Sequence, residues 1–405
     1  MKYVHRTAEE NVKEYLETFN GVIITGPRRA GKTTLARKVG EEIGAEFVSM
    51  DHPLELEYFE SRTDLFAKRH PGKYLILDEI QYARNAGRGI KYLIDIEGRK
   101  IIATGSSAEP LSKKVTSYLV GRVGIVELFP FSIEEVARAK GLKKAYSEEM
   151  RDITVEYIKY GGFPEVVLGD KKEDILKNLL ITAIQRDAAR IADTNGRDVM
   201  RAVLAITAAD GNTVEFSGLS RDSGLRYQTV RRIVDALEIS YIVHVARPYH
   251  KNKRSELRKA SKIYFTDTGI KHAVEEKFGD VISGSDVETA VLSELLKIGL
   301  KPKYWRTKGG AEVDFVVEVG LRTIPIEVKV NWGEKVPSGL REFIKTYADQ
   351  TPAAIIVDLC GNTWQREFNG VTVTKVPLWD LAKHVEEILS ESSGRAGHSS
   401  PVRGG

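Results

Sequence analysis

The sequence predicts an α/β protein of two or three domains whose first third folds around a parallel sheet. The chain has 405 residues, which exceeds the size at which a single hydrophobic core stops growing. In its first third, short apolar runs alternate with charged helical or loop segments, which is typical of a doubly wound parallel sheet. These runs are GVIIT, AEFVSMD, KYLILDE, KIIATGS and VGIVELF. Later segments mix helices with hairpins and predict smaller additional domains.

The composition is that of a soluble globular protein. Hydrophobic residues make up 42% of the chain and charged residues 29%, and no apolar run approaches the roughly 18 residues of a membrane span. The start lacks the apolar core of a secretory signal, so we expect a cytoplasmic protein without a membrane segment. Cys360 is the only cysteine, which excludes an intramolecular disulfide, and we expect it in a buried strand. The net charge of +4 does not by itself identify a nucleic-acid binder.

Five consecutive segments follow from these patterns. We expect a parallel α/β core in residues 1–130, a helical lid in 131–193, two helices and a hairpin in 194–262, a mixed α/β domain in 263–390, and a disordered Ser-, Gly- and Arg-rich tail in 391–405. The lid prediction depends on one helix from Glu173 to Ala192. Its apolar residues share one face: Ile175, Leu176, Leu179, Leu180 and Ile184.

A phosphate-binding loop follows the first apolar run. Gly26, Gly31, Lys32 and Thr33 have the spacing G-x-x-x-x-G-K-[ST], between a strand and a helix. The glycines let backbone N–H groups point inward, where the following helix adds its positive end. We expect Lys32 to contact the β and γ phosphates of ATP, and Thr33 to bind Mg²⁺. The full set of ATP contacts is Gly26, Pro27, Arg28, Arg29, Ala30, Gly31, Lys32, Thr33 and Thr34.

Further catalytic candidates follow the later strands of the same sheet. Asp78 and Glu79 end the run KYLILDE, at the edge where open α/β sheets bind ligands. We expect Asp78 to hold Mg²⁺ through water and Glu79 to polarise the attacking water, although an exposed acidic turn would show the same pattern. Ser106 is placed to sense the γ-phosphate. Arg122 is either an arginine finger, within one chain or across subunits of an oligomer, or a surface arginine.

With these motifs the chain resembles AAA-type ATPases of archaea and bacteria that carry a C-terminal nuclease-like domain. The resemblance rests on GPRRAGKTTL, LILDEIQ, ATGSSA and YGGFPEVV, and continues through KIYFTDTGI and EVDFVVEVGLRTIPIEVKV. It covers nearly all of the chain except the tail. It implies ATP hydrolysis and a fold consisting of a P-loop AAA+ core with a parallel sheet and helical lid, then a winged helix and a mixed α/β nuclease-like domain.

The middle segment carries a basic surface. The second helix of the FSGLSRDSGLRYQTVRRIVDALEIS stretch turns a set of polar residues outward, as a DNA-recognition helix does: Arg226, Tyr227, Gln228, Arg231 and Arg232. The following hairpin loop, the predicted wing, holds Lys251, Lys253, Arg254, Arg258, Lys259 and Lys262. DNA binding and a contact with a protein partner explain this pattern equally well.

The second candidate site is a set of carboxylates near the C-terminus. In EVDFVVEVGLRTIPIEVKV a two-residue turn would pair Val319 with Arg322, which places Asp314 opposite Glu327 with Lys329 on the same face. A divalent cation, Mg²⁺ or Mn²⁺, would relieve the repulsion between the two carboxylates. Restriction-enzyme-like nucleases use this D…E-x-K arrangement, and Glu288 lies on the preceding helix where that fold places an acidic residue. The alternative is a hairpin with one solvated face, and Pro325 favours an edge strand.

Two functions therefore remain open. The first is an ATPase whose nucleotide state controls nucleic-acid binding and metal-dependent cleavage. The second is a nucleotide-driven switch that binds a protein partner through a non-catalytic C-terminal domain.

Overall fold

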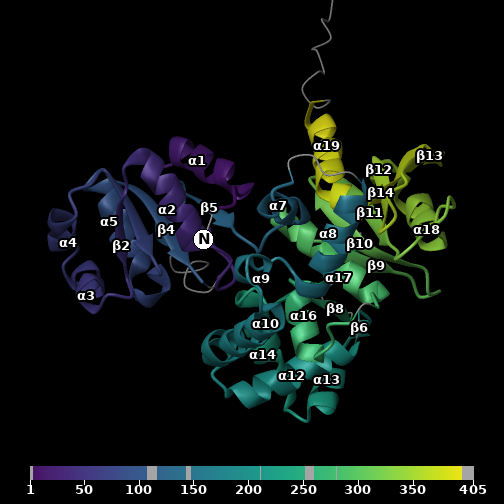
Figure 1. Ribbon diagram of the computed structural model, residues 1–405, viewed down its shortest axis with the longest axis horizontal. Coiled ribbons are helices and arrows are strands. Elements are labelled where there is room, and N and C mark those ends of the chain that lie inside the picture. Colours follow the sequence, from purple (N-terminus) through teal and green to yellow (C-terminus); the bar gives the residue numbers. More distant parts are fainter. Residues whose placement is uncertain are drawn as a thin grey trace, which may run out of the picture.

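The computed structural model describes residues 3–106, 116–142, 147–209, 211–250, 260–279 and 281–394 (Figure 1). The N-terminal elements, purple to blue, form one lobe, the teal helices lie below and the green to yellow sheet lies to the other side. Within these ranges, no helix is long and apolar enough to cross a membrane.

The N-terminal lobe contains the predicted parallel sheet. Its strands are β1 (Gly21–Thr25), β2 (Glu46–Ser49), β3 (Tyr74–Asp78), β4 (Lys100–Gly105) and β5 (Val123–Glu127), in the order β2-β3-β4-β1-β5, and every pair is parallel. This confirms the predicted α/β class. Successive side chains of β1 point to opposite faces of the sheet. Val22 and Ile24 pack in the hydrophobic core on one face, and Ile23 packs in the core on the other. The helices are α1 (Ala8–Thr18), α2 (Lys32–Ile43), α3 (Pro53–Ser61), α4 (Thr63–Arg69), α5 (Ala86–Asp95) and α6 (Thr116–Leu119).

The next helices connect the lobes. They are α7 (Ile133–Ala139), α8 (Ser147–Tyr160), α9 (Pro164–Val167), α10 (Lys172–Thr182) and α11 (Ala189–Ile191), and a π-helical segment η3 (Ala183–Ala188) joins α10 to α11. The helix expected from Glu173 to Ala192 therefore runs to Ile191, and it contains π-helical turns in its second half. Such turns are rare and often mark functional sites.

The middle part contains the two predicted helices and hairpin strands. Its helices are α12 (Gly196–Ala209), α13 (Phe216–Ser223), α14 (Tyr227–Ile239) and α16 (Thr268–Glu275), and β6 (Thr213–Val214), β8 (Ser261–Phe265) and β7 (Val243–Ala246) form an antiparallel sheet in that order. One hydrophobic core joins α10 to these helices. The wing residues Lys251, Lys253, Arg254, Arg258 and Lys259 lie outside the described ranges. Lys262 was predicted as a wing residue, and this was wrong, because β8 buries its side chain.

The C-terminal part is a six-stranded mixed sheet. It contains β9 (Lys303–Arg306), β10 (Glu312–Val319), β11 (Arg322–Val328), β12 (Ala353–Asp358), β13 (Trp364–Phe368) and β14 (Val371–Pro377), in the order β13-β14-β12-β11-β10-β9. Three helices flank it: α17 (Gly284–Lys297), α18 (Ser338–Tyr347) and α19 (Leu381–Gly394). The predicted tail began at residue 391, and this was wrong, because α19 continues to Gly394; residues 395–405 lie outside the described part.

The hairpin register is the predicted one, because Val319 pairs with Arg322 and Phe315 with Ile326. The edge-strand expectation was wrong, since β11 lies between β10 and β12. Pro325 is tolerated there because the ladder with β12 begins one residue later, at Ile326. Cys360 is half-buried and follows β12 in a bend, so the prediction of a buried strand residue was also wrong.

Helices α7 and α8 pack with the C-terminal sheet. Ile133 and Val136 of α7 and Tyr157 of α8 belong to the same core as α17 and strands β10 to β12. The segment that leaves the N-terminal sheet is therefore anchored on the C-terminal part.

Candidate functional site

The loop between β1 and α2 has the backbone geometry of a phosphate-binding loop. Gly26, Arg29 and Gly31 all have positive φ angles, at 147°, 62° and 99°. A Cβ atom at Gly26 would come 2.1 Å from the carbonyl oxygen of Leu128, so no other residue fits there. The amino end of α2 begins at Lys32, directly behind the loop.

Lys32 lies inside this loop. Its Nζ donates hydrogen bonds to the carbonyl oxygens of Gly26 at 3.0 Å and Pro27 at 2.7 Å, and the residue is 6% exposed. Burial lowers the pKa of its ammonium to about 8, against the opposing charge of Glu79. A phosphate group entering the loop would exchange these neutral acceptors for charged ones.

The predicted Mg²⁺ ligands contact each other. The hydroxyl of Thr33 donates to Oδ1 of Asp78 at 2.8 Å, and the hydroxyl of Thr104 donates to the same oxygen at 2.6 Å. These residues come from α2, β3 and β4, whose ends meet at the carboxyl edge of the sheet. Hydroxyl and carboxylate oxygens are the ligands that Mg²⁺ prefers, so the residues present fit this ion.

Glu79 is held in a strained backbone conformation beside this pair. Its φ angle is 56°, its N–H donates to Thr104 Oγ1 at 3.1 Å, and its carboxylate accepts a hydrogen bond from the side chain of Gln81. The backbone N–H of Ser106 donates to Gln81 Oε1 at 3.3 Å. The candidate sensor Ser106 thus contacts Glu79 through Gln81, whereas Thr104 contacts Asp78 directly. Gln81 was not predicted, although it stands only two residues after Glu79.

Two loop arginines reach the helices of the predicted lid. Arg28 donates to both carboxylate oxygens of Asp187, at 3.2 and 3.3 Å, and Arg29 pairs with Glu165 at 2.6 Å. Asp187 is buried and belongs to the π-helical segment η3. The loop and the lid are therefore joined by ion pairs at the position where phosphates would bind.

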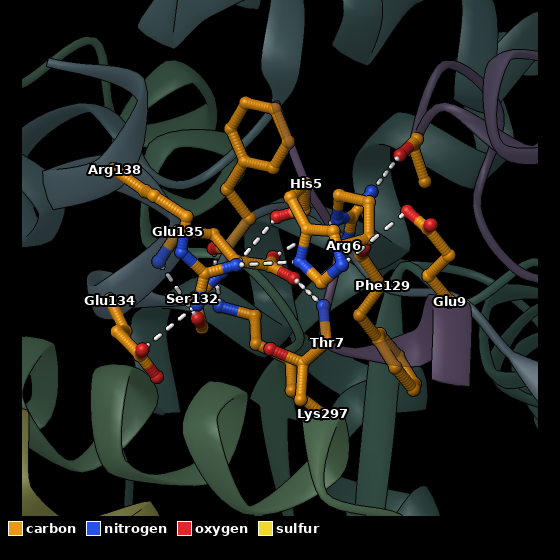
Figure 2. Close-up of polar contacts among 12 residues, drawn as sticks. His5, Arg6, Thr7, Glu9, Phe129, Ser132, Glu134, Glu135, Arg138 and Lys297 are labelled. Carbon is orange, nitrogen blue, oxygen red and sulfur yellow. Dashed lines mark hydrogen bonds and ion pairs between the residues drawn. The ribbon is translucent and has the colours of Figure 1, made fainter. Parts of the chain in front are cut away.

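A buried arginine supports the loop from behind (Figure 2). Arg6 donates to the carbonyl oxygens of Ala30 at 2.9 Å and Phe129 at 2.6 Å, and pairs with Glu135 at 3.0 Å. Glu135 also completes the capping box of α7 with Ser132. Sequence patterns did not indicate Arg6, because its partners lie between 24 and 129 residues away.

Arg122 lies at the other end of the sheet from the loop. Arg122 precedes β5, whose amino end pairs with the amino end of β1, whereas the loop follows the carboxyl end of β1. The length of β1, roughly 15 Å, therefore separates Arg122 from the loop. Its guanidinium group forms two hydrogen bonds with Asp95, at 2.8 and 2.9 Å. Arg122 does not face the loop of its own chain.

The C-terminal carboxylates gather as predicted, and they are buried. Asp314 is 9% exposed and Glu327 is 7% exposed, so the alternative of a solvated face does not hold for them. Oδ2 of Asp314 accepts the N–H of Val328 at 2.8 Å. Nζ of Lys329 lies 2.7 Å from Glu327 Oε1 and 3.9 Å from Asp314 Oδ2.

Glu288 reaches the same cluster from α17. Its Oε2 accepts the hydroxyl of Tyr264 at 2.8 Å and lies 3.9 Å from Nζ of Lys262. Burial, reinforced by the charge of Asp314, raises the pKa of Glu288 and that of Glu327 to about 7 each.

One carboxylate of this cluster offers an oxygen to a divalent cation. Oε2 of Glu327 is buried and has no hydrogen-bond partner, so it is an unsatisfied acceptor. Across the described residues, however, no three acidic, histidine or cysteine side chains converge as ligands. Lysine ammonium groups lie between the carboxylates instead, so cation binding requires side-chain rearrangement.

The middle part presents its basic helix to solvent. The predicted outward residues of α14 are all exposed: Arg226, Tyr227, Gln228, Arg231 and Arg232. At the other end of this helix, Tyr241 contacts the N-terminal lobe, since its hydroxyl lies 3.1 Å from that of Thr25.

Comparisons with known proteins support the assignment of the phosphate-binding loop in the N-terminal lobe. Residues 18–137 match the model of an AAA domain, and this similarity supports nucleotide binding by the N-terminal lobe. Residues 151–280 and 283–379 match two domains of unknown function, DUF8612 and DUF4143.

The similar proteins include several from bacteria and archaea. An uncharacterized protein of Haemophilus influenzae is 25% identical over 76% of this chain and 81% of its own length. Another, from Methanocaldococcus jannaschii, is 27% identical over 77% of this chain and 78% of its own. Among solved structures, a Walker-type ATPase of Pyrococcus abyssi is 16% identical, with a TM-score of 0.46 over 67% of this chain and 96% of that one.

Proposed function

We propose that this protein binds ATP with Mg²⁺ and hydrolyses it. The observation that carries the proposal is the contact between Thr33 and Asp78, next to a loop that encloses Lys32. The loop N–H groups and Lys32 hold the phosphates, and Thr33 and Asp78 hold Mg²⁺. The bound ion neutralises the charge that develops on the phosphate oxygens.

Glu79 acts on the attacking water in this proposal. Its carboxylate accepts a hydrogen bond from the water whose oxygen attacks the γ-phosphorus, while the bond from phosphorus to the β–γ bridging oxygen breaks. ADP leaves, and the proton of the water ends on the released phosphate. The positive φ angle of Glu79, fixed by Thr104, and its contact with Gln81 orient the carboxylate for this role. Arg122 serves as a finger only if a neighbouring subunit presents it, since it does not reach the loop of its own chain.

We further propose that nucleotide state controls an interaction with nucleic acid. The exposed basic face of α14, on a helix-turn-helix with a small antiparallel sheet, supports a winged helix that binds DNA. The unpartnered oxygen of Glu327, with Asp314, Glu288 and Lys329 around it, supports a site for Mg²⁺ or Mn²⁺ in a nuclease-like domain. Cleavage of a phosphodiester is the reaction expected there.

Assays on one preparation of the full chain test these proposals. Lys32→Ala should abolish ATP binding, whereas Glu79→Gln should bind ATP and fail to hydrolyse it. Unchanged turnover in Glu79→Gln would remove Glu79 from the mechanism. ATP binding could also serve only to support the structure, with slow hydrolysis resetting the bound state. Stimulation of turnover by nucleic acid would contradict that alternative.

DNA binding is tested through its salt dependence. Arg231→Ala should weaken binding and reduce the slope of log K against log salt by about 1, as expected for one lost phosphate contact. Arg341→Ala, which removes an exposed arginine from α18, serves as the control.

Cleavage is tested with Mg²⁺ and Mn²⁺ on single-stranded, duplex and branched DNA. Asp314→Ala should abolish it. ATP hydrolysis without DNA binding or cleavage would instead favour the nucleotide-driven switch that binds a protein partner.

A further inference from the structure

The acidic cluster contains a second lysine that comes from outside the C-terminal sheet. Lys262 lies on β8 of the middle part, and its side chain is 4% exposed. Its Nζ lies 2.5 Å from Oε1 of Glu312 and 3.9 Å from Oε2 of Glu288. The rings of Tyr264 and Tyr304 also lie near this ammonium, each with its centroid at 5.9 Å. A lysine so enclosed has little freedom to move away from the carboxylates.

Lys262 and Lys329 divide the carboxylates into two halves. Lys262 lies between Glu288 and Glu312, and Lys329 lies between Glu327 and Asp314. The two halves differ in exposure at their lysines, because the side chain of Lys329 is 32% exposed, about eight times more than that of Lys262. The carboxylate oxygen without a partner, Oε2 of Glu327, belongs to the more exposed half.

We propose that Lys262 is a fixed positive charge that restricts the acidic cluster to one divalent cation, bound at the half formed by Asp314 and Glu327. This proposal rests on the cation-binding function proposed above. Glu312 already pairs with both Lys262 and Arg306, and Lys262 also lies near Glu288, whereas Asp314 and Glu327 share only the more exposed Lys329. A second ion would have to displace a buried ammonium from Glu288 and Glu312. Lys262 is thus a positioning residue, and it makes the cluster a site shared between the middle and C-terminal parts of the chain.

Binding of Mn²⁺ to the full chain tests this role, measured by calorimetry at pH 8. Every variant also carries Asp78→Asn, which removes the charged cation ligand of the nucleotide site. The parent should bind one Mn²⁺, and Asp314→Asn should abolish this binding. Lys262→Met should bind Mn²⁺ about tenfold more tightly or take up a second ion, because a nearby positive charge has been lost. Lys262→Arg, which keeps the charge, should bind one ion.

Two further variants separate charge from structure. Glu312→Gln should weaken Mn²⁺ binding severalfold, since it removes a negative charge and leaves Lys262 in place. This opposite sign does not follow from a purely structural role, and it tests the proposal even if Lys262→Met fails to fold. Lys303→Met is the control, because Lys303 on β9, the strand next to β10, pairs with Glu318 at 2.5 Å and is a partly buried lysine of the C-terminal sheet.

The outcomes distinguish this proposal from the one on which it rests. If the parent binds no Mn²⁺, the proposed cation site and the role of Lys262 both fail. If Asp314→Asn abolishes binding while Lys262→Met, where folded, and Glu312→Gln match the parent in affinity and stoichiometry, the role of Lys262 alone is overturned.

Discussion

The hydroxyl groups of Tyr241 and Thr25 lie 3.1 Å apart, which joins the end of the basic helix α14 to the strand that leads into the phosphate loop. The same hydroxyl donates to Glu127 at 3.3 Å, and the ring packs edge-on against Phe129. Tyr241 has a φ angle of 60°, a conformation that a bulky residue adopts only where its surroundings enforce it. The middle part and the N-terminal lobe therefore meet at a tightly specified contact.

Tyr241→Phe should lower the free energy of unfolding by about 1 kcal/mol, because the ring stays packed while the hydroxyl is lost. Chemical denaturation of the full chain measures this loss. Tyr227→Phe on the same helix is the control, since Tyr227 is 43% exposed. Equal stabilities of the two variants would show that the contacts of the Tyr241 hydroxyl with Thr25 and Glu127 contribute nothing.

ATP binding should weaken as the pH rises above 8. Without nucleotide the pKa of Lys32 is about 8, below its ordinary value, and bound phosphate favours the charged form and raises that pKa. At a pH between the pKa values of Lys32 without and with nucleotide, ATP binding is coupled to the uptake of a proton by Lys32. The affinity for ATP is therefore constant below about pH 7 and falls up to tenfold per pH unit above 8. Fluorescent ATP titrations without Mg²⁺ measure this, and melting curves over the same range check the fold. A flat profile from pH 7 to 10 would contradict the assigned role of Lys32.

Gln81→Leu should lower kcat for ATP hydrolysis about tenfold and leave KM unchanged, because Gln81 holds the carboxylate of Glu79 and lies outside the phosphate loop. Steady-state kinetics measure both constants. A rise in KM with an unchanged kcat would instead indicate that Gln81 supports nucleotide binding.

The buried ion pair between Lys375 and Asp358 should be costly to break. The two side chains are both 0% exposed and lie 2.6 Å apart, and Asp358 also accepts the N–H of Trp332 in the loop that follows Lys329. Lys375→Met should lower the free energy of unfolding by about 3–5 kcal/mol, since it leaves Asp358 buried and unpaired.

Two comparisons sharpen this last prediction. The double variant Lys375→Met, Asp358→Leu should recover much of the loss. Arg366 lies on β13 and forms an exposed ion pair with Glu334. Arg366→Met should lower the free energy of unfolding by about 1 kcal/mol or less. A loss of similar size from both single variants would mean that burial of the Lys375 pair has no special effect.

The candidate sites divide clearly by how much the sequence predicts. The loop from Gly26 to Thr33 and the hairpin that carries Asp314 and Glu327 were predictable, because their geometry depends on neighbouring residues: glycines at positive φ in one case, a two-residue turn in the other. The end of a strand also predicts which edge of a parallel sheet a residue occupies. Arg122 precedes β5, so the same rule places Arg122 at the amino edge of the sheet, away from the loop.

Other residues depend on contacts between distant segments. Arg6 supports the loop across 24 residues and contacts Phe129 across 123, and Lys262 lies close to carboxylates on α17 and β10. Neither has a local pattern, because an isolated arginine or lysine in the sequence is usually solvated.

By itself, therefore, the sequence determined the parallel α/β lobe, its phosphate loop and the register of the acidic hairpin, since local spacing and backbone conformation encode these features. Only the tertiary structure decided that Lys262 belongs to the acidic cluster rather than to an exposed wing, and that Tyr241 touches the strand before the loop. The physical reason is that packing chooses the partner of a charged or polar side chain, and that partner lies on a segment brought close only by folding.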